Sequence, residues 1–206
     1  MALNHPTHPV LHPVRIEKLR PTQMTVGYRE VARKRHDWRE RLDRDGPDFL
    51  GRHMIPVVTG PGGTMWLIDN HHLARALHDE GVKEVLVSIV ASLDHLGKRR
   101  FMTFMENRNW LHPYDAEGKR VAYKEVPRSV AKLVDDPYRS LAGEMRRAGG
   151  FAKVETPYAE FLWADFLRPR VPARLLERDF DKAVMKALHA AHGEEAVYLP
   201  GYCGTY

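Results

Sequence analysis

The spacing of apolar and polar residues predicts a first half that mixes strands with helices. Apolar and charged residues alternate over 14–19, which is typical of a short strand. Apolar residues then recur at helical spacing over 26–44, with a densely charged opposite face. The remaining elements expected in this half are a hairpin of strands over 53–59 and 65–69, a helix over 71–80 and a buried strand over 84–92.

The pattern becomes helical after residue 95. Helices are expected over 98–108, 137–149, 158–167 and 172–192, while 121–133 has no assignable period. The sequence therefore predicts an α+β fold in three parts. These are a flexible N-terminal arm over 1–13, an α/β domain over 14–95, and a helical extension and tail over 96–206 packed on that domain.

Length and composition fit one large domain or a small domain with an extension. The chain has 206 residues, of which 43% are hydrophobic and 29% charged, so neither a disordered nor a fibrous class fits. No apolar run reaches the roughly 18 residues of a membrane helix, and no secretion signal is visible, so we expect a cytoplasmic protein without a membrane partner. A single cysteine, Cys203, excludes an internal disulfide framework.

A formal net charge of +5 makes ligands that carry phosphate more plausible. Seven of the basic residues lie between 29 and 44, on the expected helix. This helix could follow a nucleic-acid backbone, but its interspersed acidic residues favour a solvated face with ion pairs at i,i+4 spacing. No short glycine-containing turn joins two helices as in a helix-turn-helix motif, so the C-terminal helices are expected to form a packed bundle.

The junction between the strand over 65–69 and the helix over 71–80 is the segment best suited to chemistry. A strand that turns into a helix presents backbone N–H groups and the positive end of the helix dipole, which favour an anion. Asp69 could ligate Mg²⁺ or accept a proton, His71 and His72 could bind phosphate or act as acid and base, and Arg75 follows one turn later. The alternative is a plain helix cap, with Asn70 as the N-cap.

Three segments of the chain resemble the ParB/sulfiredoxin superfamily, most closely the ParB-like putative nuclease family. They are the Leu-Arg-Pro-x-Gln segment over 19–23, Pro-Val-Val over 56–58, and the Ile-Asp-x-His-His-x-x-Arg-Ala-Leu segment that begins at Ile68. The resemblance extends into 136–150 and 161–166, so that it covers most of residues 14–170.

The resemblance implies a mixed-sheet domain whose turn binds the phosphates of a nucleotide such as ATP, ADP or CTP, with Mg²⁺ as the cofactor. Asp69, His71 and His72 match the Asp-x-His-His turn, and Gln23 matches the first loop of the ParB type. Glu30 is the nearest carboxylate that could serve as a base, as in the kinase-like relatives. Asn70 stands where relatives have glycine, and Leu73 stands where they have an arginine, whose charge Arg75 could replace.

The sequence leaves two functions of different classes open. The first is a protein that binds nucleotide or other phosphate groups at Asp69–His72, with nuclease, nucleotide hydrolase or phosphotransferase activity. For this function Asp69, His71, His72 and Glu30 are the catalytic candidates, and Gln23, Asn70, His71, His72 and Arg75 contact phosphate. The second is a DNA-associated partition or regulatory protein without catalysis. A homodimer is compatible with both.

Overall fold

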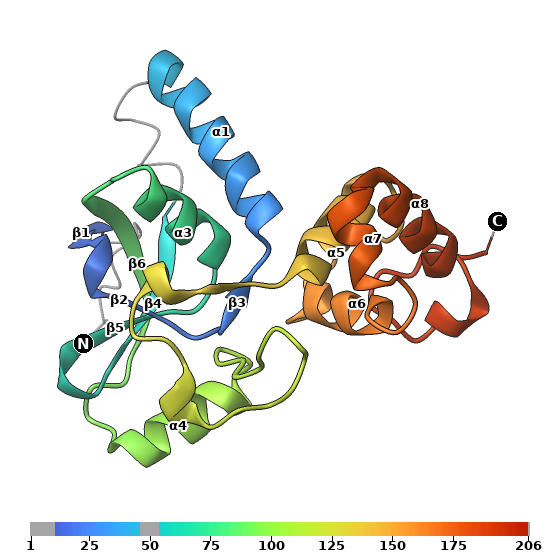
Figure 1. Cartoon of the computed structure of the whole chain (residues 1–206). Coiled ribbons are helices and arrows are strands. Elements are labelled where there is room, and N and C mark those ends of the chain that lie inside the picture. The colour runs from blue at the N-terminus through green and yellow to red at the C-terminus, as the bar shows by residue number, and fades with distance from the viewer. Residues whose placement is uncertain (1–10, 46–53, 206) are drawn as a thin grey trace, which may run out of the picture. The chain divides into compact units, whose positions relative to one another are not determined.

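The structure is a computed structural model that describes residues 11–45 and 54–205. The chain forms two compact units (Figure 1). The first contains the described residues up to 24 together with 31–115 and 119–134, and the second contains 25–30, 116–118 and 135–206. The boundary expected near residue 95 therefore lies inside the first unit, because helix α4 (Lys98–Asn107) buries its apolar face in that unit's core.

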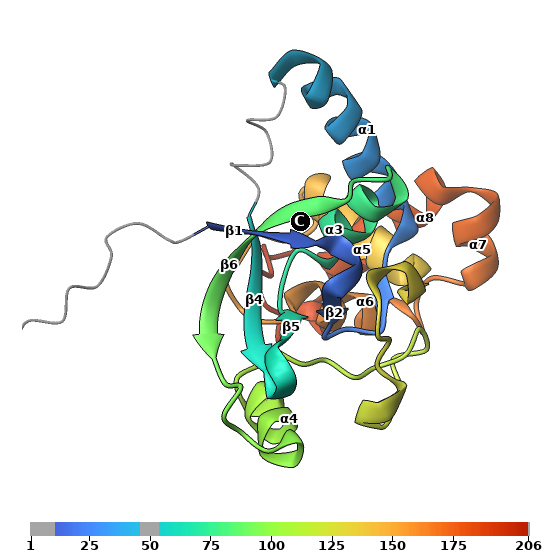
Figure 2. The same ribbon diagram turned by 90° about the vertical axis from the view of Figure 1, so that its left-hand side faces the viewer.

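A five-stranded mixed sheet forms the centre of the first unit (Figure 2). Its strands, in spatial order, are β1 (Leu11–Arg15), β6 (Glu84–Ser92), β4 (Ile55–Gly60), β5 (Thr64–Leu67) and β2 (Leu19–Pro21). The pairs β1–β6 and β4–β5 are antiparallel, whereas β4–β6 and β2–β5 are parallel. The expected hairpin, the buried strand over 84–92 and the mixed α+β class are thus confirmed.

The single strand expected over 14–19 is wrong, because the chain forms two strands there with the 3₁₀ turn Ile16–Lys18 between them. Val14, Ile16 and Leu19 are all buried. The step of three residues from Ile16 to Leu19 fits a 3₁₀ turn rather than a strand, whose period is two. The turn lets the chain cross from β6 at one edge of the sheet to β5 at the other. Of the expected N-terminal arm, residues 1–10 lie outside the described residues, and Leu11–Pro13 belong to β1.

Three helices accompany the sheet or extend from it. They are α1 (Tyr28–Asp45), α3 (His71–Asp79) and α4. Helix α4 packs Phe101 and Met105 with Val58 and Trp66 of the sheet. Helix α3 ends at Gly81, whose φ of +76° is a conformation that favours glycine. The region 121–133 contains two short 3₁₀ turns, Tyr123–Glu125 (η3) and Val130–Lys132 (η4).

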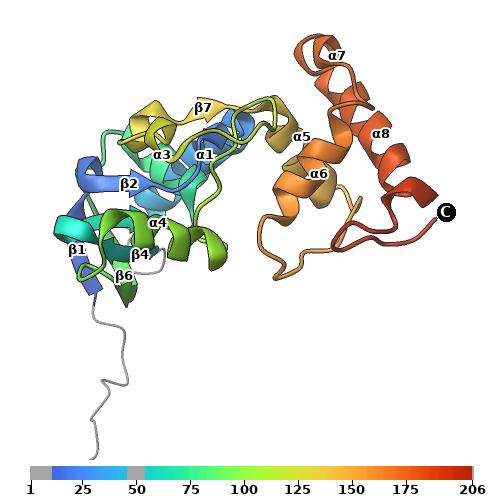
Figure 3. The ribbon, with the colours of Figure 1, turned by 90° about the horizontal axis from the view of Figure 1, so that it is seen from below.

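The second unit is a helical bundle (Figure 3). Its helices are α5 (Pro137–Arg147), α6 (Ala159–Leu167), α7 (Ala173–Arg178) and α8 (Phe180–Ala191). Asp136 caps α5 as its Oδ1 accepts a hydrogen bond from Tyr138 N at 3.0 Å. Trp163 is fully buried and stacks on Phe151 with ring centroids 4.7 Å apart. The two-stranded sheet of β3 (Thr25–Val26) and β7 (Val134–Asp135) completes the described elements.

The single helix expected over 172–192 is wrong, because the chain breaks at Asp179 into α7 and α8. Asp179 leaves the helical conformation (φ −153°, ψ 83°), and its Oδ1 accepts a hydrogen bond from Lys182 N at 3.0 Å. Aspartate is a favoured N-cap, and the cap competes here with continuation of the helix. No helix within the described residues is both long enough and apolar enough to cross a bilayer.

Candidate phosphate-binding turn

Strand β5 ends at Leu67 and helix α3 begins at His71, so only three residues form the turn between them. Asn70 adopts the left-handed conformation (φ 62°, ψ 29°), which asparagine tolerates better than most residues. Its side chain does not cap α3, so the expected N-cap role is wrong. The amide Nδ2 instead donates to the Met54 carbonyl at 3.2 Å, because a capping side chain normally requires an extended backbone at that position.

His71 is buried, with 2% of its surface exposed. Its Nε2 accepts a hydrogen bond from Thr22 N at 3.1 Å, and Thr22 Oγ1 donates to the Leu67 carbonyl at 2.7 Å. Thr22 therefore ties the loop after β2 to both the end of β5 and the start of α3. Because a ring nitrogen that accepts a backbone N–H carries no proton, His71 is suited to position the turn rather than to donate from Nε2.

His72 and Asp69 are the more accessible groups of the turn. His72 lies in the first turn of α3 and is partly exposed. Asp69 is exposed, and its Oδ1 accepts a hydrogen bond from Asn70 N at 2.6 Å. Among the residues that the structure describes, no three His, Cys, Asp or Glu side chains gather to hold a metal ion. One carboxylate still fits Mg²⁺, which proteins commonly hold through one or two carboxylates together with substrate phosphates and water.

The structure brings Gln23 to the same loop, where it is buried. Gln23 forms an isolated parallel bridge with His112, whose backbone N donates to the Thr22 carbonyl at 2.9 Å. The His112 ring stacks on Tyr114 with centroids 4.3 Å apart. Neither Thr22 nor His112 is predicted from the sequence. Thr22 lies inside the Leu-Arg-Pro-x-Gln segment, which offers a signal, but the contact of residue 112 spans about ninety positions and leaves no local pattern.

Arg75 is held elsewhere on the helix. Its Nε donates to both carboxylate oxygens of Asp79 at 3.0 Å, and its Nη1 donates to the Leu133 carbonyl at 2.7 Å. These contacts join the later part of α3 to the segment after η4. Leu73 is buried, so neither position supplies the turn with the guanidinium that relatives carry directly after the histidines.

Glu30 belongs to the second unit. It is buried, and its Oε2 accepts a hydrogen bond from Arg147 Nη1 at 2.5 Å. Desolvation opposes the charge of Arg147, but the hydrogen bonds to Glu144 and Glu30 prevail, so that the pKa of Arg147 is raised. A carboxylate held in such a pair has a structural use already, and nothing in its described contacts joins it to Asp69 or His72.

Arg20 is a further residue that the sequence does not single out. Its guanidinium stacks on the Trp66 ring, with Cζ 4.4 Å from the centroid. Its buried Nε donates to no acceptor within the described part of the chain. Burial lowers the pKa of Arg20, and the neighbouring Arg128 lowers it further. The strand that leads into Thr22 thus carries a cation without a carboxylate partner among the described residues.

Comparison with known proteins places the chain in a family. Residues 12–169 match the family described as "Putative ParB-like nuclease". The crystal structure of protein Atu1540 from Agrobacterium tumefaciens is 49% identical and covers 97% of this chain and 100% of its own, with a TM-score of 0.90. No curated protein sequence matches.

A more distant likeness is to the chromosome-partitioning protein ParB from Caulobacter crescentus, truncated at its C-terminus and complexed with CTP-gamma-S. It is 13% identical and covers 91% of this chain and 96% of its own, with a TM-score of 0.32, which is too low to establish a shared arrangement. The family match stands without it, since it spans more than half of the chain and includes every residue of the turn. The chain therefore belongs to the family of ParB-like nucleases.

Proposed function

We propose that the turn Asp69–His72 binds the phosphate groups of a nucleotide. The observation that carries this proposal is the hydrogen bond from Thr22 N to the buried ring of His71, which fixes the turn against the loop after β2. A turn that is held rigidly, and whose helix has no side-chain cap, is the arrangement that anion sites at helix N-termini require.

The chemistry of the turn supports the same ligand. The positive end of the α3 dipole favours negative charge, and the left-handed Asn70 directs the chain into the first turn of the helix without a capping side chain. His72 adds a side chain that can donate to a phosphate oxygen. Membership of the ParB-like nuclease family and the Asp-x-His-His segment agree with phosphate as the group recognised.

We further propose that the bound nucleotide undergoes hydrolysis or phosphoryl transfer. Mg²⁺ held between Asp69 and the phosphates would neutralise charge on the phosphoryl group. His72 then holds or moves a proton at the phosphate or its acceptor, because it is the accessible histidine of the turn. His71 serves as a positioning residue, since its Nε2 already accepts from Thr22.

Titration calorimetry with ADP, ATP and CTP, with and without Mg²⁺, tests this function. The variant H72A is expected to weaken nucleotide binding about tenfold, the loss of one strong charge-assisted contact. The matched control is H78A, which removes a partly exposed histidine from the other end of α3. Equal affinities in H72A and H78A, or no heat from any nucleotide with the folded wild-type protein, would refute phosphate binding at this turn.

A further inference from the structure

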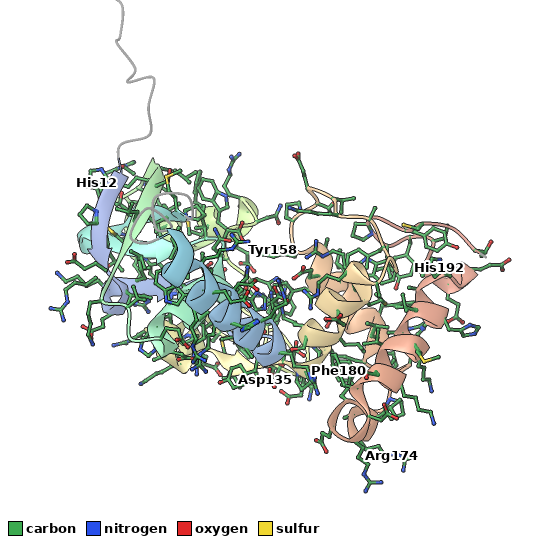
Figure 4. All side chains as sticks on the ribbon, turned by 90° about the horizontal axis from the view of Figure 1, so that it is seen from above. His12, Asp135, Tyr158, Arg174, Phe180 and His192 are labelled. Carbon is green, nitrogen blue, oxygen red and sulfur yellow. The ribbon has the colours of Figure 1, made fainter. Side chains whose placement is uncertain are left out.

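A second cationic site lies in the other unit, between α7 and α8. A pocket of about 360 Å³ there is lined by two apolar and four basic residues, namely Pro172, Leu175, Arg174, Arg178, Lys182 and Lys186. All four basic residues are exposed. Figure 4 shows Arg174 directed away from the ribbon. No carboxylate lines the pocket, so its rim is uniformly positive.

The break at Asp179 creates this arrangement. The four basic residues recur at intervals of four, so in one continuous helix they would spread along about 18 Å of its axis. Because the chain breaks between α7 and α8, Arg174 and Arg178 instead face the same pocket as Lys182 and Lys186. The acidic residues nearby do not line the pocket, and Asp179 accepts the α8 backbone N–H of Lys182.

These four cations have no described acceptor, in contrast to the basic residues of α1. On α1, Arg33 pairs with Asp37 at 3.1 Å, and Arg35 and Arg39 both pair with Glu80 at 2.5 and 2.7 Å. Arg174, Arg178, Lys182 and Lys186 form neither a side-chain hydrogen bond nor an ion pair with any residue that the structure describes. The cations on α1 are therefore largely neutralised within the protein, whereas those on α7 and α8 remain available to an external anion.

We propose that the pocket between α7 and α8 binds the phosphodiester backbone of a nucleic acid without sequence preference. Each helix contributes two cations one turn apart, a separation of about 6 Å along the axis. Phosphates of one B-DNA strand follow each other at about 3.4 Å along the duplex axis, so two such rows match a run of phosphates better than one compact anion. The apolar floor of Pro172 and Leu175 supplies no base-reading donors or acceptors, so affinity comes from charge.

The pocket shares no residue with the nucleotide turn, so variants can separate the two sites. The variant R174Q/R178Q/K182Q/K186Q removes the four charges at exposed positions, and K18Q/K83Q/K132Q/K153Q removes the same charge from exposed lysines elsewhere. Binding of a fluorescent DNA duplex is measured for both full-length variants between low and moderate salt. Circular dichroism and thermal unfolding establish that each variant is folded, and R174E/K186E provides a second variant with fewer changes.

The pocket variant is expected to lose about tenfold or more in affinity, and its slope of log K against log salt concentration should fall by up to about 3.6. The scattered-lysine variant should stay within about twofold of wild type. Equal losses in both variants, or wild-type binding by the pocket variant and R174E/K186E, would overturn the proposal. Displacement of the duplex by tripolyphosphate at equal phosphate concentration would overturn it too, because it would identify a compact anion as the ligand. Nucleotide calorimetry should not change in the pocket variant.

Discussion

At the scale of single residues, the proposed site depends on a small group of contacts around Thr22. This side chain is 1% exposed and lies where the end of β5, the start of α3 and the loop after β2 meet. Its backbone N–H holds the His71 ring, and its hydroxyl satisfies the Leu67 carbonyl. The turn is therefore positioned by a residue that touches no ligand in the proposed function.

Replacement of Thr22 by valine keeps the shape of the side chain but removes the hydroxyl. The buried Leu67 carbonyl then loses its donor, so the free energy of unfolding should fall by about 1–3 kcal/mol. T22S keeps the hydroxyl and should retain more of the stability than T22V. Urea unfolding of both variants checks this, and equal stability in T22V and wild type would contradict the role of the hydroxyl.

Asn70 tests the backbone of the turn itself. With φ at 62°, alanine at this position should cost about 1–2 kcal/mol, whereas glycine accepts the conformation without strain. Both variants lose the hydrogen bond to the Met54 carbonyl, so the difference between N70A and N70G isolates the backbone effect. Thermal unfolding should rank N70G above N70A, and the reverse order would show that the left-handed turn is not maintained in solution.

At the scale of elements, α3 is held to α1 by charge. Glu80, at the end of α3, accepts hydrogen bonds from Arg35 and Arg39 of α1. The hydrogen bond from Arg39 lowers the pKa of Glu80 against the opposing effect of burial, and Arg35 adds to the lowering. These contacts fix the C-terminal end of the helix whose first turn forms the proposed site.

The lowered pKa of Glu80 gives this contact a defined dependence on pH. A carboxylate whose folded pKa lies below its unfolded value stabilises the fold above the unfolded value, near 4.5, and loses that effect as the pH falls through the folded value. The variant E80Q should therefore be less stable than wild type at pH 7, and the gap should close between about pH 5 and pH 3. Urea midpoints of E80Q and of the control E84Q across this range provide the measurement. A gap that stays constant with pH would contradict the ion pair.

Asp179 controls the break between α7 and α8. Alanine cannot accept the hydrogen bond from Lys182 N, so D179A should lower the free energy of unfolding by about 1 kcal/mol and favour a continuous helix. D179N, which can still cap, should restore most of the stability. If D179A raised the stability and D179N lowered it, the cap would not be what divides these helices.

At the scale of the whole molecule, the elements predicted from the sequence are those with strong local signals, and the elements that depend on distant partners are not predicted. The strand over 84–92, the hairpin around Gly60–Gly63 and the Asp136–Pro137 helix start are all present, because their signals lie within a few residues. The crossing at Ile16–Lys18 and the break at Asp179 depend on what the rest of the fold covers, and a local period does not register this.

The candidate site shows the same division. Asp69–His72 is recognisable in the sequence as a strand-to-helix turn, but the roles within it are not. Only the fold shows that His71 is buried against Thr22, that Arg75 faces Asp79, and that Glu30 pairs with Arg147 in the second unit. Each of these partners lies at least four positions away, and two of the three lie more than forty away, so spacing alone could not separate the positioning residue from the reactive one.

Phosphate binding at the turn between β5 and α3 can be observed at the level of single amides. The experiment is backbone amide NMR of the full chain, titrated with ATP and Mg²⁺. We expect the largest shift changes on the amides of residues 69–73, with smaller changes at Thr22 and none above noise in α7 and α8. Changes confined to another part of the molecule, with the amides of 69–73 unmoved at saturation, would contradict phosphate binding at this turn.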